Sequence, residues 1–113
     1  MVKLIALLKR KPGMTMDEFK VRWVDEHTKI SSKMPRLRGY YCNVATPQQP
    51  DGGEPVYDGT AELWWDSMED MEADFKTQEG ILGGNDADSF MSVRTHLYTT
   101  EYTIIPFAGH NSK

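Results

Sequence analysis

The sequence predicts an α+β fold of the ferredoxin-like type, a four-stranded antiparallel sheet with helices on one face. Three observations support this prediction. The N-terminus reads as an apolar strand, a helical spacing of apolar residues follows it, and the second half repeats the same strand and helix order. With 113 residues, 39% of them apolar, the chain suits a single domain over residues 1–107. Residues 108–113 read as a flexible C-terminal tail.

The first predicted strand, Val2 to Lys9, is apolar on both of its faces. Leu4, Ala6 and Leu8 alternate with Ile5 and Leu7. Helices can cover only one face of the sheet, so the other face needs a second layer. A second copy of the chain is the simplest source, and we therefore expect a homodimer with its sheets packed face to face.

The first predicted helix begins with a capping box formed by Thr15 and Glu18. Apolar residues then recur at spacings of three and four, and they form one stripe at roughly 100° per residue on an α-helix. The only polar member of this stripe is His27. Pro35 is expected to end the helix. The stripe comprises Met16, Phe19, Trp23, His27, Ile30 and Met34.

Two further strands follow, from Leu37 to Val44 and from Asp58 to Trp65. The first carries Tyr40. Between them, Thr46 to Pro55 is rich in proline and glycine, so it should form a loop, which we place near the site.

The C-terminal third should hold two short helices and a long strand. Ser67 is a good N-cap for a helix with Met68, Met71 and Phe75 on one stripe. Glycines at 80, 83 and 84 are expected to break that helix, and Asn85 or Asp86 then to cap a short one carrying Phe90 and Met91. The last strand should run from Val93 to Ile105, ended by Pro106.

Composition excludes several classes of function. A net charge of −4 and a pI near 5.3 give no electrostatic basis for nucleic-acid binding. The single cysteine, Cys42, excludes an internal disulfide and suits a reducing compartment. The apolar run from Leu4 to Leu8 is too short for a signal peptide or a membrane span, so we expect a cytoplasmic protein with no membrane partner. No pair among His27, His96 and His110 has metal-ligand spacing, and no metal site is predicted.

What remains is acid–base chemistry centred on His27. Imidazole titrates near neutrality, so it can act as a base with little adjustment. The alternative is a buried histidine that is satisfied by a backbone carbonyl. Glu62 also has two interpretations: a salt bridge at an edge or dimer interface, which we favour, or a catalytic acid if it faces the pocket. For His96 and Tyr98 we expect interface packing rather than catalysis.

Three segments of the chain resemble the EthD family of dimeric α+β barrels. They are Trp23-x3-His27, Met34-Pro35-x-Leu37-x-x-Tyr40 and Tyr57-Asp58-Gly59-x-Ala61-Glu62-x-Trp64-Trp65. The resemblance implies a ferredoxin-like monomer, a dimer built through the sheets, and a small-molecule pocket between each sheet and its helices. Several members of the family work without cofactors, and we expect none here. His27 matches the histidine that the family carries at the end of its first helix, and Tyr40 matches its strand tyrosine.

The family includes methylmuconolactone methylisomerases, which carry a cysteine where this chain has Leu63, so a thiol-dependent isomerisation is not expected. Our hypothesis is a cofactor-independent lyase or isomerase for a small, mostly apolar oxygenated compound such as an aromatic polyketide or a lactone. The alternative is a non-catalytic accessory protein that binds such a compound beside an oxidative pathway. The candidate catalytic residues are His27, Tyr40 and Glu62, and the candidate substrate-binding residues are Trp23, Leu63, Trp65, Phe75, Phe90 and His96.

Overall fold

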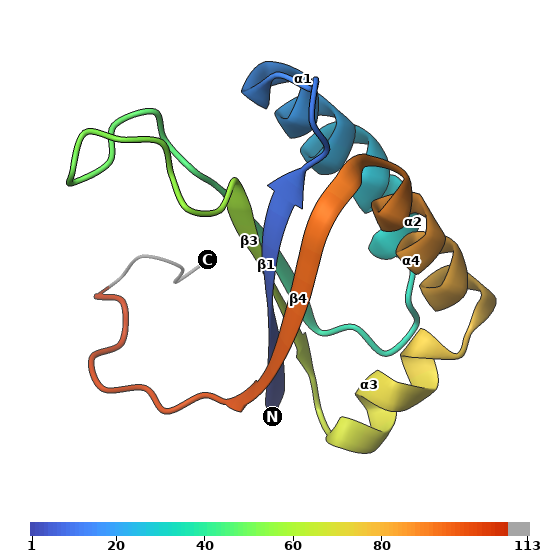
Figure 1. Ribbon diagram of the computed structural model, residues 1–113. Coiled ribbons are helices and arrows are strands. Elements are labelled where there is room, and N and C mark those ends of the chain that lie inside the picture. Colours follow the sequence, from blue (N-terminus) through green and yellow to red (C-terminus); the bar gives the residue numbers. More distant parts are fainter. Residues whose placement is uncertain (109–113) are drawn as a thin grey trace.

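The computed structural model describes residues 1–108 (Figure 1). The predicted tail therefore lies outside the described residues except for Ala108, and so does His110. The helices and strands follow the order β-α-β-β-α-β, with the first helical segment divided into three parts. Their bounds are β1 (Val2–Arg10), α1 (Met16–Lys20), η1 (Val21–His27), α2 (Thr28–Ser31), β2 (Gly39–Val44), β3 (Gly59–Trp65), α3 (Met68–Phe75), α4 (Gln78–Phe90) and β4 (Met91–Thr100).

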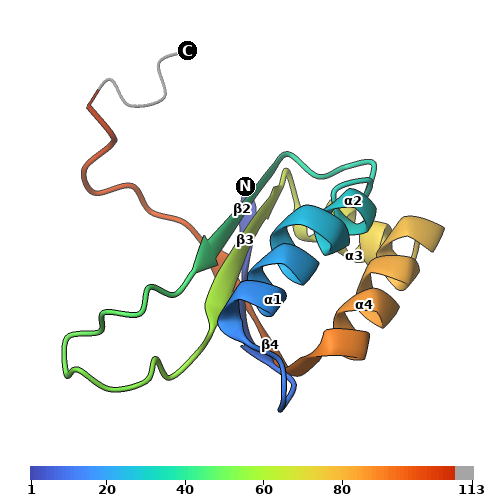
Figure 2. The same ribbon diagram turned by 90° about the horizontal axis from the view of Figure 1, so that it is seen from above.

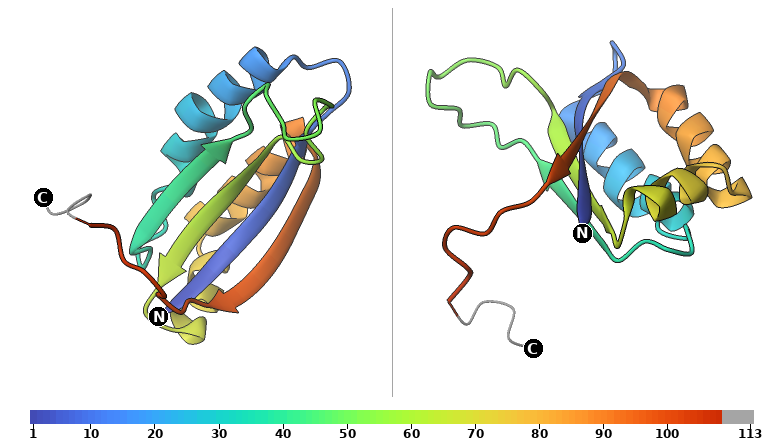
Figure 3. Two further views of the ribbon diagram at one scale, coloured as in Figure 1. Left: turned by 90° about the vertical axis from the view of Figure 1, so that its left-hand side faces the viewer. Right: turned by 90° about the horizontal axis from the view of Figure 1, so that it is seen from below.

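The four strands form one antiparallel sheet in the order β2-β3-β1-β4. All helices pack on one face of this sheet, as Figure 2 shows, and the opposite face is uncovered (Figure 3). The arrangement confirms the predicted ferredoxin-like fold.

The register of the strands separates the two faces of the sheet. Leu4 pairs with Leu63 on β3 and with Tyr98 on β4, and these side chains point toward the helices. Ile5 pairs with Glu62 and Leu97 on the uncovered face, where Leu97 is 55% exposed. The core thus lies between the sheet and the helices, and the outer face mixes apolar with charged groups.

The first helical segment begins at the predicted capping box and then changes its winding. Thr15 accepts a hydrogen bond from the Glu18 backbone N–H, while the Glu18 carboxylate accepts one from the Thr15 backbone N–H. From Val21 to His27 the helix is a π-helix, and it ends at Ser31, earlier than Pro35.

The π-helical stretch explains which side chains face the sheet. The buried residues are Phe19, Trp23, His27 and Ser31, each four positions after the one before, whereas Ile30 is only half-buried. In an α-helix a spacing of four drifts by roughly 40° per step. The wider i→i+5 winding of a π-helix offsets that drift and keeps all four side chains on one face.

Helix α4 departs from the sequence prediction. It is a single 13-residue helix capped by Thr77, whose side chain accepts from the Gly80 N–H, and the predicted glycine break with a cap at Asn85 or Asp86 is wrong. A Cβ atom at position 80 would overlap the carbonyl oxygen of Asp74. The glycine therefore allows α3 and α4 to approach closely, and this packing outweighs its low helix propensity.

The last strand ends at Thr100 rather than at Ile105. The neighbour of β4 is β1, and Thr100 already pairs with Val2, the first residue of that strand. Residues beyond Thr100 have no strand to pair with, and Ile104 and Ile105 are exposed. The loop from Thr46 to Pro55 lies against Arg10 and Met16 rather than beside His27, so its expected place near the site was wrong.

Candidate functional site

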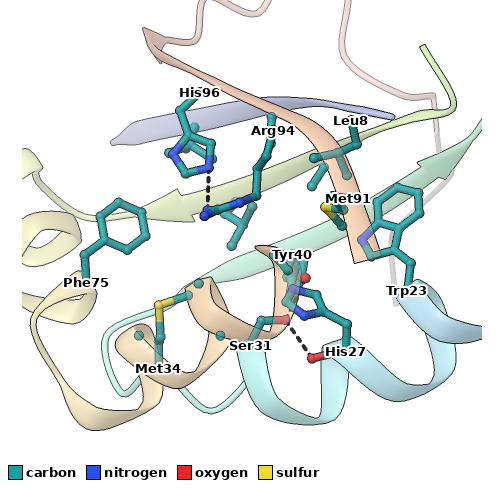
Figure 4. A pocket seen from close by; sticks show the side chains of 18 of the residues that line it. Leu8, Trp23, His27, Ser31, Met34, Tyr40, Phe75, Met91, Arg94 and His96 are labelled. Atoms are coloured by element: carbon teal, nitrogen blue, oxygen red, sulfur yellow. Dashed lines mark hydrogen bonds between the residues drawn. The ribbon is translucent and has the colours of Figure 1, made fainter. Parts of the chain in front are cut away.

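A cavity of about 260 Å³ lies between the sheet and the helices, with residues from all four strands and from η1, α2, α3 and α4 around it (Figure 4). Its size is slightly below the roughly 300–1,000 Å³ typical of small-molecule sites. Most of the lining is apolar, and the polar groups are few and well separated in the sequence. The polar side chains are His27, Ser31, Tyr40, Arg94, His96 and Tyr98.

The imidazole of His27 is held by a carboxylate from helix α4. His27 Nδ1 lies 2.8 Å from Oδ2 of Asp86. The guanidinium of Arg22 donates two hydrogen bonds to the same carboxylate, of 3.0 and 2.6 Å. Arg22, Asp86 and His27 therefore form a chain that fixes the ring at the end of the π-helical stretch.

The charges in this chain determine the state of the imidazole. Hydrogen bonds from Arg22 are the main cause that lowers the pKa of Asp86, so the carboxylate is ionised and can only accept. His27 Nδ1 must then carry the proton, which leaves a lone pair on Nε2. Burial lowers the pKa of His27 despite the opposing effect of Asp86. His27 is thus a neutral base at pH 7, and within residues 1–108 its Nε2 has no hydrogen-bond partner.

Tyr40 reaches the cavity from β2 and lies beside the same helix. Its hydroxyl is 2.7 Å from Oγ of Ser31, and Ser31 in turn donates to the backbone carbonyl of His27 at 3.3 Å. The tyrosine is therefore the donor in its bond to Ser31. Burial raises the pKa of Tyr40 far above its usual value, so the phenol keeps its proton. Burial also raises the pKa of the neighbouring Cys42 thiol to about 11, which does not favour thiolate chemistry.

The opposite wall of the cavity carries Arg94 and His96 on β4. The Arg94 guanidinium donates to Asp88 at 2.9 Å through one terminal nitrogen and lies 3.4 Å from His96 Nε2 through the other. Since arginine can only donate, Nε2 of His96 is the acceptor. His96 also stacks on Phe75, with 6.2 Å between the ring centroids.

Comparison with known families and structures fits this architecture. The family model of the EthD domain matches residues 11–94, which include His27, Asp86 and Arg94. The chain belongs to the EthD family. Comparison with curated proteins gives no match.

Solved structures of similar fold support the assignment. An EthD family protein from Bacillus halodurans is 28% identical, with a TM-score of 0.78 over 90% of this chain and 99% of its own. A dimeric ferredoxin-like protein of unknown function from Thermobifida fusca is 16% identical, with a TM-score of 0.69 over 88% and 90%. SnoaB, a cofactor-independent oxygenase from Streptomyces nogalater, is 8% identical, with a TM-score of 0.68 over 94% and 97%. At these lower identities, the last two show a shared fold.

The cavity brings together most of the residues predicted from the sequence. Two of the three candidate catalytic residues line it, together with four of the six candidate substrate-binding residues. The residues that line it are His27, Tyr40, Trp23, Leu63, Phe75 and His96.

Trp65 and Phe90 are buried behind the cavity wall rather than in it. The Trp65 indole N–H donates to Asp74 at 2.7 Å, and its ring packs edge-on against Phe75. The ring centroids of Phe90 and His27 are 5.7 Å apart. The Cζ atom of Arg22 lies over the Phe90 ring, 4.4 Å from its centroid. Both residues therefore position groups that line the cavity or hold His27.

Glu62 is separated from the cavity because it lies on the uncovered face of the sheet. Its carboxylate pairs with Lys3 at 2.7 Å and accepts from Asn43 at 2.8 Å. Adjacent residues of a strand point to opposite faces, so Leu63 faces the cavity while Glu62 faces away from it. The salt-bridge interpretation fits this position, and the catalytic one does not.

Sequence reasoning missed four polar residues of the site: Arg22, Ser31, Asp86 and Arg94. A signal for Arg94 was available, since it lies two positions before His96 and so on the same strand face. A signal for α4 was the small-residue pattern Gly80, Gly83, Gly84 and Ala87, which follows helical spacing and lines the cavity. The Arg22–Asp86 pair is 64 residues apart in sequence, and no local pattern indicates it.

Within residues 1–108, no three His, Cys, Asp or Glu side chains are grouped closely enough to hold a metal ion. Over the same residues, the structure has no helix with the length and apolar character needed to cross a membrane.

Proposed function

We propose that this EthD-family protein is a cofactor-independent lyase or isomerase that uses His27 as its general base. Its substrate would be a small, mostly apolar oxygenated compound, of the aromatic polyketide or lactone type. We further expect the enzyme to act in the cytoplasm. The observation that carries the proposal is a neutral imidazole with a free Nε2, held by Asp86 at the wall of an apolar cavity.

The chemistry follows from the chain of charges around His27. When Nε2 takes a proton from the substrate, the imidazole becomes a cation whose Nδ1–H already donates to the ionised Asp86. The carboxylate stabilises that cation, and Arg22 keeps the carboxylate in place. The apolar walls exclude water and so strengthen each hydrogen bond in the site. The proton then returns to a different atom of the substrate or to a leaving group, as isomerases and lyases require.

Tyr40 would supply a second hydrogen bond. Its phenolic proton is held by Ser31, and a substrate oxygen entering the cavity can compete for it. Because the pKa of Tyr40 is raised, the residue suits a donor and not a base.

The proposal includes a homodimer built through the uncovered face of the sheet. Tyr41 is 57% exposed and Leu97 is 55% exposed on that face, and Ile5 and Leu7 between them are half-buried. Large exposed apolar groups of this kind mark interfaces. The similar fold from Thermobifida fusca is described as dimeric, which supports the same assembly here.

Deuterium exchange tests the function without the natural substrate. The bicyclic ketone 2-tetralone carries acidic C–H groups next to its carbonyl, and a general base in the cavity should exchange them for deuterium in D₂O. We expect the wild-type protein to catalyse this exchange and His27→Gln to lower the rate by roughly 10²–10⁴. Glu26→Gln is a matched control, because the Glu26 carboxylate lies 3.7 Å from Arg22 on the exposed side and makes no ion pair with the His27 ring.

The same experiment separates catalysis from binding. If 2-tetralone binds to the wild-type protein, as followed by its NMR line widths, but no exchange occurs, the accessory-protein alternative is favoured. A folded His27→Gln variant that exchanges at the wild-type rate would end the general-base proposal.

A further inference from the structure

Arg94 holds an unused donor in the wall of the cavity. Its side chain extends from β4 toward the centre of the space, across from the helix that carries His27 and Ser31 (Figure 4). The two terminal nitrogens contact Asp88 and His96, but Nε is buried and has no hydrogen-bond partner. Within residues 1–108 no other buried side-chain nitrogen or oxygen lacks a partner.

A buried N–H of a charged group that lacks a hydrogen-bond acceptor lowers the stability of a folded protein, because its hydrogen bond to water is lost and is not replaced. An unpaired buried donor in a native structure calls for an explanation, and a role in a catalytic or binding site is one of those known. The residue paired directly opposite Arg94 is the apolar Leu8, and Met91 near by is also apolar. The acceptor on the same strand, His96, faces a terminal nitrogen of the guanidinium rather than Nε. A ligand oxygen is the group that fits.

The charge of Arg94 is also incompletely neutralised on the cavity side. Its partner Asp88 is 68% exposed, so water screens that carboxylate while the buried side of the guanidinium stays positive. The same positive charge contributes to the lowered pKa of His27. Arg94 and the base therefore act on the same space.

We propose that the Arg94 guanidinium binds the substrate oxygen on which negative charge collects when His27 removes a proton. This proposal rests on the proposed function and names its substrate class: a carbonyl compound with an acidic C–H next to the carbonyl group. In the step, the C–H bond breaks and Nε2 of His27 gains the proton. The electron pair of that bond forms a C=C bond, and the carbonyl π pair moves onto the oxygen at Arg94. No oxidant or second reactant is needed.

The cavity is open on the α4 side of the Arg94 guanidinium. Gly84 on α4 faces Arg94, and a Cβ atom placed there would lie 3.9 Å from the terminal nitrogen of the guanidinium. Gly83 lies beside it against Ser31. The absence of side chains at both positions keeps the space between Arg94 and the His27 helix open.

A phenolate is a stable mimic of the enolate oxygen, so 4-nitrophenol tests the proposal directly. Its absorbance reports its ionisation. We expect the wild-type protein to bind the phenolate form preferentially and to lower the pKa of the bound phenol by about one unit or more, as a nearby cation does. Arg94→Met should reduce phenolate affinity by roughly 10- to 100-fold. Binding of 4-nitroanisole, which has no acidic O–H, should be unchanged.

Two further variants control the experiment. Arg38→Met removes an arginine whose salt bridge to Asp66 is on the exposed surface, and phenolate binding should be unaffected. Arg94→Gln keeps a polar side chain at the position but removes the guanidinium, and it should lose the phenolate preference as Arg94→Met does.

Three results would overturn the proposal. One is a bound 4-nitrophenol whose pKa in the wild-type protein is unshifted or raised, a measurement that needs no variant. Another is failure of the wild-type protein to bind the phenolate at millimolar concentration. The third is wild-type phenolate preference in either folded Arg94 variant. Phenolate binding involves no proton transfer from carbon. Failure of the exchange experiment would therefore count against His27 as the base and leave the phenolate experiment valid. Failure of the phenolate experiment would count against Arg94 and leave the exchange result valid.

Discussion

Asp86→Asn isolates the contribution of the carboxylate that holds His27. The substitution keeps the size of the side chain but removes its charge. The new amide can also donate to Nδ1, which would place the ring proton on Nε2 and remove the lone pair that faces the substrate. Both changes act on the base without touching the cavity wall, since Asp86 does not line the cavity.

The expected loss follows from the distance between the two groups. At an effective dielectric constant of about 20, opposite unit charges separated by the 2.8 Å between Nδ1 and Oδ2 attract by roughly 6 kcal/mol. Arg22 contacts the same carboxylate and already offsets part of its charge. We therefore expect a net loss of about 3 to 5 kcal/mol from the protonated state of His27, or roughly 10²–10⁴ in the rate of proton transfer.

Two measurements check this prediction. The rate of 2-tetralone exchange should fall in Asp86→Asn but not in Glu26→Gln, which leaves the Asp86–His27 contact intact. The pKa of His27, followed by NMR, should fall below its wild-type value, because Asp86 is the group that raises it. An Asp86→Asn protein with wild-type exchange and an unchanged His27 pKa would refute the role assigned to this pair.

Three further predictions concern stability and assembly. The pKa of His27 is lowered in the folded state, so below pH 6.5 the unfolded chain binds a proton that the folded protein does not. The contribution of His27 to stability should therefore be fully present above pH 6.5 and be lost as the pH falls. The melting temperature should depend less on pH in His27→Gln. Gly84→Ala should raise stability by up to about 1 kcal/mol, because the added methyl group makes only ordinary van der Waals contacts. Gly80→Ala should lower stability, because its methyl group would overlap the Asp74 backbone. Thermal melts should show a higher melting temperature for the first variant and a lower one for the second. Light scattering at micromolar concentration should give the mass of a dimer, since a stable pair buries more than about 1,200 Å² and survives at such concentrations. Leu97→Asp should give a folded monomer while Val21→Asp, exposed on the helical side, should stay dimeric; a monomeric wild type would contradict the sheet-to-sheet assembly.

The fold could be predicted because local patterns and the final architecture agree. The alternation of Leu4, Ile5, Ala6, Leu7 and Leu8 specifies a strand with two apolar faces, and the structure uses one of them for its core. Short-range capping was equally readable, as the Thr15–Glu18 pair shows.

The errors occurred where distant contacts decide the local structure. Gly80 reads as a helix breaker, yet it lies inside α4 because the backbone of Asp74 leaves no room for a larger residue. The end of β4 is set by the first residue of β1 and not by Pro106. The partner of His27 comes from a helix 59 residues away, so the residue could be proposed as a base while its state could not be derived.

The π-helical winding between Val21 and His27 links the length of this segment to the direction of the side chains that follow it. Winding Val21 to His27 as an ordinary α-helix without changing its length would turn everything after it by roughly 100° relative to Phe19. Deleting one residue at the same time would cancel most of that turn, so the histidine could still share a face with Trp23 and meet Asp86. In alignments of EthD relatives, a one-residue gap between Trp23 and His27 should therefore be compatible with a retained histidine–carboxylate pair.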